Sequence, residues 1–471
     1  MKIALIVPHV GRKDLNDPGK YVHTWQMEPT MIAALAALTP DDVEVVMVDE
    51  RLGEPMVYDV DLAAITCETY TAKRTYEICE QYRTKNIPTI VGGWQAMLIP
   101  EEVAQYADSV FIGYAEPLWN QVISDLRNGE LQPVYRSGSV RESGFIIPDR
   151  SIYNKRPYFG ISCLETGRGC PLKCNFCSIT SATNATYGPR SQEEIVADIG
   201  SIPHKTVFLV EDNFFGNMKN ARKTLEAIIP LGIRWVGQGT LALAHDEEVL
   251  GLMKASGCMG ILIGFESFKE ETLRAMDKPF NIGMQKYGTY EELIRRIHKY
   301  NIAIYGTFVF GYDTDTLADF EETTERAIDY GIAIAAFNHL LPFPGTPLYR
   351  RFKEEGRLID DPWWLSPTYR YGQVPFQPRN MRPEELHEAC LRARERFYSV
   401  PSILKRAVTN PRGNFHSVGK AGVYTTLNWS LRREIMEKDG LPLGNLDRKP
   451  IPKTNLIGGM YEEDAISLAR G

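Results

Sequence analysis

The amino-acid sequence predicts an α/β protein with two successive parallel sheets and a helical C-terminal region. Two observations predict this class. Short, uniformly apolar runs alternate with amphipathic helical stretches in two separate series, as in parallel sheets that are covered on both faces. At 471 residues the chain is also long enough for several domains. We place the domains at residues 1–140, 155–375 and 376–471, the last with a helical start and a loose tail.

The first series predicts a doubly wound domain of the flavodoxin or Rossmann type. Its helical stretches include residues 29–38 and 72–85, and a polar segment at 128–157 is expected to be a linker. Ligands of such sheets bind outside the carboxyl ends of the strands. The expected strands are 2–7, 43–48, 61–66, 88–93 and 108–113.

The second series predicts a partial (βα)6 barrel of the TIM type. In such barrels the chemistry lies at the carboxyl ends of the strands. After residue 376 the pattern is helical, and from Asp439 a mixture of Pro, Gly and charged residues predicts a loosely attached tail. The expected strands are 159–165, 206–212, 233–239, 260–266, 303–311 and 334–341.

Composition narrows the class of protein. The chain is 44% hydrophobic and 24% charged with a net charge of −7, which argues against a general nucleic-acid surface. The longest apolar run, residues 31–38, is far too short to span a membrane, and the start "MKIALIVPHV" lacks a signal-peptide pattern. Eight cysteines without a secretory signal predict reduced thiols in the cytoplasm.

Three cysteines, Cys170, Cys174 and Cys177, lie within eight residues just past the first strand of the second series. A closed zinc site needs a fourth ligand, but Cys163 lies within the strand and His204 is distant. Three thiolates on an iron–sulfur cubane would instead leave one iron without a protein ligand, as a catalytic site requires. A structural zinc site and unligated core cysteines are the alternatives.

The stretch "CPLKCNFC", with aromatic Phe176 before its last cysteine, resembles the signature of the radical S-adenosylmethionine (SAM) superfamily. The later stretches "VEDNFFGN", "GFES", "FVFGYDTDT" and "LPFPGTPLYRRFKEEGRL" agree in order, so that the resemblance covers about residues 158–371. It implies a 4Fe–4S cluster on the three cysteines, with SAM on the open iron. It also implies a small-molecule substrate and an electron donor such as flavodoxin or ferredoxin.

The same resemblance implies which other residues lie at the SAM side of the site. Glu266, at the end of the fourth strand, is the expected hydrogen-bond acceptor for SAM, and the alternative is a buried, paired carboxylate. The remaining expected cofactor contacts are Phe176, Asp212, Gln238 and Leu341.

The first domain lacks the G-x-G-x-x-G turn of dinucleotide sites after its first strand. It resembles the cobalamin-binding domain of cobalamin-dependent radical SAM enzymes. The D-x-H-x-x-G element, whose histidine ligates cobalt in many cobalamin proteins, is absent. The identity of the lower cobalt ligand is therefore open, and the alternative is a scaffold domain that binds no cobalamin. The implied cobalamin contacts are Thr66, Thr69, Tyr70, Gly92, Gly93, Gly113 and Glu116.

These resemblances imply a cobalamin-dependent radical SAM enzyme that methylates an unactivated carbon of a small molecule or lipid. One alternative is a non-methylating radical SAM enzyme that cyclises or rearranges its substrate or transfers another SAM fragment, such as the 3-amino-3-carboxypropyl group. Another is a cofactor-binding sensor module. The aromatic segment 360–376 is expected either to line a substrate pocket, with Arg370 as an anion clamp, or to pack helices onto the barrel.

Overall fold

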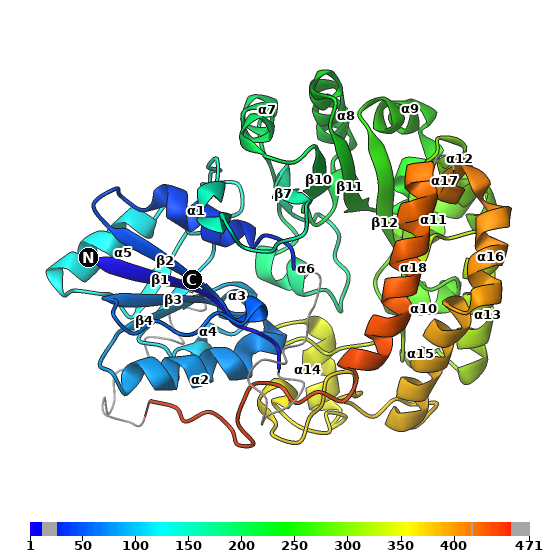
Figure 1. Cartoon of the computed structure of the whole chain (residues 1–471). Helices are drawn as coiled ribbons and strands as arrows, with labels where there is room; N and C mark the ends of the chain where they lie inside the picture. Colours follow the sequence, from blue (N-terminus) through cyan, green and yellow to red (C-terminus); the bar gives the residue numbers. More distant parts are fainter. Residues whose placement is uncertain (12–25, 416–417, 454–471) are drawn as a thin grey trace.

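The computed structural model describes the chain except residues 12–25, 416–417 and 454–471. Two six-stranded sheets, each accompanied by helices, lie side by side (Figure 1). All strand pairs within both sheets are parallel, which confirms the predicted α/β class.

The first sheet has the order β2-β1-β3-β4-β5-β6, so that β1 lies between β2 and β3 and the chain changes direction there. A ligand site is expected beyond the carboxyl ends of strands near such a reversal. Helices α1 (Thr30–Leu38) and α5 (Trp119–Asn128) pack on one face, and α2 (Ala72–Arg83) packs on the other. The strands are β1 (Lys2–Val7), β2 (Glu44–Asp49), β3 (Leu62–Thr66), β4 (Thr89–Gly92), β5 (Ser109–Ile112) and β6 (Val134–Arg136).

Strand β6 corrects the predicted linker at 128–157. Val134 pairs with Val110 of β5, so the first sheet gains a strand inside the segment that was expected to lack one. Three residues are too few to produce a recognisable period, and flanking Gly, Ser and Pro residues dominate the pattern. Short helices α3 (Trp94–Leu98) and α4 (Pro100–Val103) follow β4.

The second sheet has the order β14-β13-β12-β11-β10-β7, and all six predicted strands are present. Strands β7 and β14 form its two edges, so the barrel is partial, as predicted. A short antiparallel pair of strands, β8 (Gly167–Gly169) and β9 (Tyr187–Pro189), follows β7 and was not expected. The strands are β7 (Ser162–Leu164), β10 (Thr206–Leu209), β11 (Arg234–Gly239), β12 (Cys258–Glu266), β13 (Ala303–Phe310) and β14 (Ile334–His339).

Several of the helices between these strands bury an apolar stripe against the sheet. Helix α12, for example, buries Leu293, Ile294 and Ile297 and begins with a capping box at Thr289. The helices are α6 (Ser178–Thr183), α7 (Gln192–Ser201), α8 (Met218–Ile228), α9 (Glu247–Ala255), α10 (Glu270–Ala275), α11 (Pro279–Gly283), α12 (Tyr290–Lys299), α13 (Leu317–Asp329) and α14 (Pro347–Glu354).

The aromatic segment after the barrel packs against the first domain. Trp363 and Trp364 are buried in the same apolar core as β3 and α2, and the Trp364 indole donates to a carboxylate oxygen of Glu102 at 2.9 Å. Arg370 donates to the carbonyls of Pro367 and Tyr369 in its own loop. The structure therefore favours packing over a pocket, but the partner is the first domain rather than the C-terminal helices.

The C-terminal region begins with four helices, α15 (Pro383–Phe397), α16 (Val400–Thr409), α17 (Pro411–Phe415) and α18 (Val418–Lys438). The loose tail predicted from Asp439 is wrong for residues 440–453, which lie against α2 (Figure 1). Lys73 donates to the Leu446 carbonyl at 2.6 Å, and Glu77 accepts from the backbone of Asn445 and Leu446. The rest of the predicted tail, residues 454–471, lies outside the described residues.

Within the described part of the chain, no helix has the length and apolar character that crossing a membrane would require.

Candidate cofactor site between the two sheets

The loop that carries Cys170, Cys174 and Cys177 follows β8 and is held by contacts with distant segments. The side chain of Asn175, inside the loop, donates to the Ala275 carbonyl at 2.8 Å and accepts from the Tyr312 hydroxyl at 2.8 Å. The Asn175 carbonyl also accepts from Leu348 N. The cysteine loop is therefore fixed to the carboxyl side of the barrel, where the sequence predicted it.

The three thiols lie close enough to influence one another electrostatically. The pKa of Cys174 is raised to about 12, chiefly by burial; Lys278 opposes this rise, and the two neighbouring thiols add to it. The pKa of Cys170 is also raised, chiefly by burial. Because a coordinated metal deprotonates a thiol outright, such a group of buried thiols suits a cationic partner.

An iron–sulfur cubane fits this donor set. Among the residues that the structure describes, no three His, Cys, Asp or Glu side chains converge on one ion. A cubane presents separate iron corners, so its three thiolates need not converge on a single point. The side-chain amide of Asn213 lies 3.6 Å from the Cys170 sulfur and donates to it, as a hydrogen-bond donor to a cluster ligand would.

Glu266 forms a buried ion pair with Lys278, whose ammonium group lies 2.7 Å from a Glu266 carboxylate oxygen. Lys278 also donates to the Gly264 carbonyl at 2.9 Å. Glu266 has a positive φ of 59° at a register shift between β12 and β13, and this bulge directs its carboxylate towards the Cys174 side. The paired carboxylate that we considered as the alternative is present, and contact with SAM stays a prediction.

Asp212 follows β10 and accepts a hydrogen bond from Gly169 N at 2.9 Å, so it contacts the residue before Cys170. Burial raises its pKa to about 6. The adjacent Glu211 is fully buried, accepts from the Thr166 hydroxyl and has a pKa raised by burial to about 7. Two neighbouring carboxyl groups therefore hold protons more tightly than usual beside the cysteine loop.

The other expected SAM-side residues are dispersed around the same barrel end. Phe176 meets the Tyr312 ring edge-on, with ring centroids 6.4 Å apart. Gln238 is half-buried on β11, and Leu341 packs against the core of the first domain. No contact in the structure assigns them to SAM, and their role stays a prediction.

A cavity of about 360 Å³ lies between the carboxyl ends of the two sheets. This volume is in the range of small-molecule sites. Five of the seven residues expected to contact cobalamin line it, together with Glu165, Arg168 and Asp212 from the barrel side. The five are Thr66, Gly92, Gly93, Gly113 and Glu116.

At two positions in this lining the backbone conformation and the close packing require glycine. Gly93 has φ of +100°, and a Cβ there would lie 2.7 Å from the Cys67 carbonyl oxygen. Gly113 has φ of +102°, and a Cβ would lie 2.2 Å from the Ser137 hydroxyl. At Gly92 a Cβ would make only ordinary contact with Phe111. The two strained positions keep the floor of the cavity free of side chains, which fits a large flat cofactor.

The remaining two expected cobalamin contacts are not part of the cavity lining. The Thr69 hydroxyl is buried and donates to Gln95, and Tyr70 packs against the rings of Trp363 and Tyr371. His9 is buried, and its backbone N–H donates to Glu50. These three residues hold the first domain together around the strand ends.

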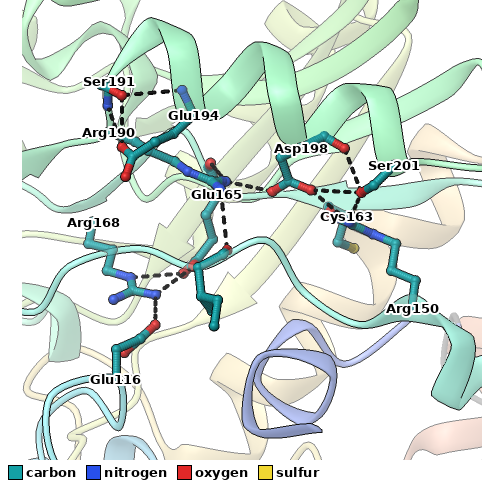
Figure 2. Close-up of polar contacts among 11 residues, drawn as sticks. Glu116, Arg150, Cys163, Glu165, Arg168, Arg190, Ser191, Glu194, Asp198 and Ser201 are labelled. Atoms are coloured by element: carbon teal, nitrogen blue, oxygen red, sulfur yellow. Dashed lines mark hydrogen bonds and ion pairs between the residues drawn. The ribbon is translucent and has the colours of Figure 1, made fainter. Parts of the chain in front are cut away.

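Arg168 links the cysteine loop to the first domain, a role that sequence reasoning missed. Its guanidinium donates to Glu116 at 2.5 Å and to Glu165 at 2.8 Å (Figure 2). The same guanidinium lies over the rings of Tyr114 and Phe145, with distances of 4.3 and 4.5 Å to their centroids. The two domains are thus joined through a buried ion pair at the edge of the cavity.

A second cluster of charged side chains, Arg150, Arg190 and Asp198, also lines the cavity. Asp198 on α7 accepts from Arg150 and from Arg190, each at 2.6 Å (Figure 2). Arg190 also donates to the Glu165 carbonyl, and its buried Nε has no hydrogen-bond partner among the described residues. The sequence offered no signal for these pairs, since their members lie up to 48 positions apart.

Comparisons with known proteins agree with this arrangement. Residues 164–327 match the profile described as the Radical SAM superfamily. The chain is 28% identical over 397 residues to bacteriochlorophyllide d C-12(1)-methyltransferase of Chlorobaculum tepidum, covering 81% of this chain and 85% of that one. It is 25% identical over 398 residues to hopanoid C-2 methylase of Rhodopseudomonas palustris, covering 81% and 73% of the two chains.

Among solved structures, the fold is similar to that of OxsB, a cobalamin-dependent S-adenosylmethionine radical enzyme determined with aqua-cobalamin and S-adenosylmethionine bound. The TM-score is 0.63 at 14% identity, over 92% of this chain and 72% of the other. The likeness extends over both sheets and therefore concerns the fold of the whole arrangement.

Proposed function

We propose that this chain, which belongs to the radical SAM superfamily, is a cobalamin-dependent enzyme that methylates an unactivated carbon of a small molecule or lipid. The observation that carries the proposal is the cavity that lies between the carboxyl ends of both sheets. Residues near the cysteine loop form one wall, and the strained glycines Gly93 and Gly113 form part of the other. Two cofactors bound on these walls would face each other across a shared space.

The residues of the chain fit the three groups that this reaction needs. Cys170, Cys174 and Cys177 would hold the 4Fe–4S cluster, with Asn213 donating to the Cys170 sulfur. The strand ends with Gly93 and Gly113 would hold cobalamin. When bound, the cluster, SAM and cobalamin together supply the electron, the hydrogen-abstracting radical and the methyl group that C–H methylation requires.

The protein itself orients these groups and excludes water. The Arg168–Glu116 pair fixes the cysteine loop against the first domain, so the distance between the two walls is set by a buried contact. Apolar side chains line much of the space between them, and such walls limit the access of water to a reactive centre. They include Met31, Leu35, Trp94, Met97, Ile146 and Ile179.

The names of the two curated relatives support a large, mainly apolar substrate. One is named for a bacteriochlorophyllide and the other for a hopanoid, and both names state methylation. The apolar lining of the cavity suits a substrate of that kind. The substrate of this chain is therefore proposed to be a polycyclic or lipid-like molecule.

Labelled SAM tests the proposed reaction. Protein reconstituted anaerobically with iron, sulfide and cobalamin, and supplied with a reductant, should form 5′-deoxyadenosine and transfer the methyl label to a product. Formation of 5′-deoxyadenosine without methyl transfer would favour cyclisation or rearrangement. Transfer of label from the 3-amino-3-carboxypropyl group would favour that fragment transfer.

A further inference from the structure

Helix α16 (Val400–Thr409) buries polar side chains and exposes aliphatic ones. Ser402 and Arg406, four residues apart, are buried against the barrel. Val400, Leu404 and Val408 repeat at the same spacing on the opposite side and are exposed. A surface helix normally turns its aliphatic stripe inwards and its charged side chains outwards.

The orientation of α16 is fixed by a dense set of hydrogen bonds. The guanidinium of Arg406 donates to the carbonyls of Ile332, Ala333 and Phe397, at 3.1, 2.7 and 2.9 Å respectively. It also donates to the Asn428 side chain at 2.9 Å and stacks on the Phe397 ring. Because rotating the helix would break these bonds, its aliphatic stripe is held facing outwards.

The exposed stripe stands out from the rest of the surface. Val408 is 80% exposed and Leu404 is 62% exposed, the two highest values for large apolar side chains among the described residues. The next two are Val423 and Trp429, both 56% exposed and both on α18. The Tyr424 hydroxyl donates to the Ile403 carbonyl at 2.8 Å, so that α18 lies against α16.

The charge of this region is also unusual. No Asp or Glu occurs between Glu395 and Glu434, although the whole chain has 60 acidic and 53 basic residues. Nearby acidic groups on α13 are paired, Glu325 with Arg396 and Asp329 with Lys405. Seven basic residues lie in the acid-free interval: Arg396, Lys405, Arg406, Arg412, Lys420, Arg432 and Arg433.

Two exposed cations of this interval remain for an outside partner. Arg412 and Arg432 form no ion pair in the part of the chain that the structure describes, and Arg432 lies over the Trp429 ring at 5.6 Å. Aliphatic and aromatic side chains beside unpaired arginines are the composition of surfaces that lie on anionic membranes.

The position of this face excludes the most obvious protein partner. Arg406 contacts the residues just before β14, and Lys420 donates to the carbonyls of Met259 and Asn301 near the starts of β12 and β13. These are the amino ends of the strands, whereas the cysteine loop lies at the carboxyl ends. A protein that delivers an electron to the cluster would therefore dock elsewhere.

A second copy of the chain is also disfavoured. A symmetric dimer through this face would bring the same basic region of both copies together, which places like charges opposite one another. Figure 1 shows α16 at the outer edge of the second domain, on the side opposite the first sheet.

We propose that the face formed by α16 and α18 docks on the surface of an anionic lipid bilayer. Val400, Leu404 and Val408 would enter the interfacial region, and Arg412 and Arg432 would contact lipid phosphates. The proposal does not depend on the reaction, since binding needs neither the cluster nor cobalamin.

Vesicle flotation with the full chain tests this docking. We expect binding to vesicles that contain phosphatidylglycerol, at least tenfold weaker binding to pure phosphatidylcholine, and loss of most binding in 0.5 M salt. The double variant Leu404→Gln/Val408→Gln should lose at least tenfold in affinity. Ile359→Gln, at another exposed apolar position, should bind as the natural protein does.

Circular dichroism and the thermal midpoint establish that both variants fold. Absence of binding to every vesicle, or equal binding by the folded double variant, would overturn the proposal. Sedimentation equilibrium tests the alternative that this face joins two copies of the chain. A dimer that the double variant dissociates would assign the face to self-association and would equally overturn lipid docking.

Discussion

The guanidinium of Arg168, two residues before Cys170, lies 2.5 Å from the carboxylate of Glu116 in the other domain. Both side chains are largely buried. This pair connects the cysteine loop directly to the strand-end loop that borders the cavity. The spacing of the proposed cofactors thus depends on a contact between residues 52 positions apart.

Replacing Arg168 with Met should destabilise the protein by about 3 kcal/mol, because the carboxylate of Glu116 would be left buried without its partner. Urea unfolding of the metal-free protein measures this. Arg127→Met removes an exposed pair with Asp42 and should cost less than about 1 kcal/mol. Equal effects of the two substitutions would show that the domain contact contributes little.

The Lys278–Glu266 pair should show strong coupling. Lys278→Met alone leaves the Glu266 carboxylate buried near Cys174 and should cost about 3 kcal/mol. Adding Glu266→Gln should restore much of that stability, since no uncompensated charge remains. A double-mutant cycle on unfolding free energies gives the coupling, and additive effects would contradict the pairing.

Glu211 should make stability fall as the pH rises. Burial raises its pKa to about 7 from an ordinary value of 4.5, so the folded state binds this proton more tightly than the unfolded state. The resulting loss begins near pH 4.5 and is complete above about pH 7, at a cost on the order of 3 kcal/mol. Glu211→Gln should remove this part of the pH dependence. The thermal midpoint of the natural protein and of the Glu211→Gln variant is measured against pH. Parallel curves for the two proteins would contradict the proposed contribution of Glu211.

Cys174→Ala should abolish the cluster without unfolding the chain. With one of three ligands lost, reconstituted protein should hold far less than four irons per chain and form no 5′-deoxyadenosine. Cys390→Ala, at a buried position on α15, is the matched control and should keep both. Full iron content in the Cys174 variant would refute the assigned ligand set.

Gly93→Ala should weaken cobalamin binding. The added Cβ approaches the Cys67 carbonyl at a positive φ, which strains the turn at the cavity floor by about 1–3 kcal/mol. Gly129 also has a positive φ but no atom within 4 Å of an added Cβ, so Gly129→Ala separates backbone strain from distortion of the cavity. Equilibrium dialysis with cobalamin measures both variants, and equal affinities would contradict a role for Gly93.

Local pattern in the sequence predicted much of the fold. Largely apolar strands, such as residues 260–266, and the cysteine spacing around Cys174 are signals carried by neighbouring residues. The long-range pairs were not predictable in this way. The residues around Arg168 do not indicate that its partner is Glu116, and those around Glu266 do not indicate Lys278. Ion pairs between distant segments produce no periodic pattern in the sequence.

Two larger errors have the same origin. The aromatic segment around Trp363 and the chain at Asn445 both lie against the first domain, more than 200 residues earlier in sequence. Aromatic, proline and glycine residues are common to pockets, packed segments and loose tails alike. Which of these a segment forms is decided by the surface that it meets.

The central claim is that both walls of the cavity hold a cofactor for methyl transfer. The most direct measurement is the iron, sulfide and cobalt content of anaerobically reconstituted protein, made alongside methyl-labelled SAM turnover. We expect about four irons and one cobalt per chain, with methyl label in the product. Protein that carries the cluster and forms 5′-deoxyadenosine but retains no cobalt would contradict the claim.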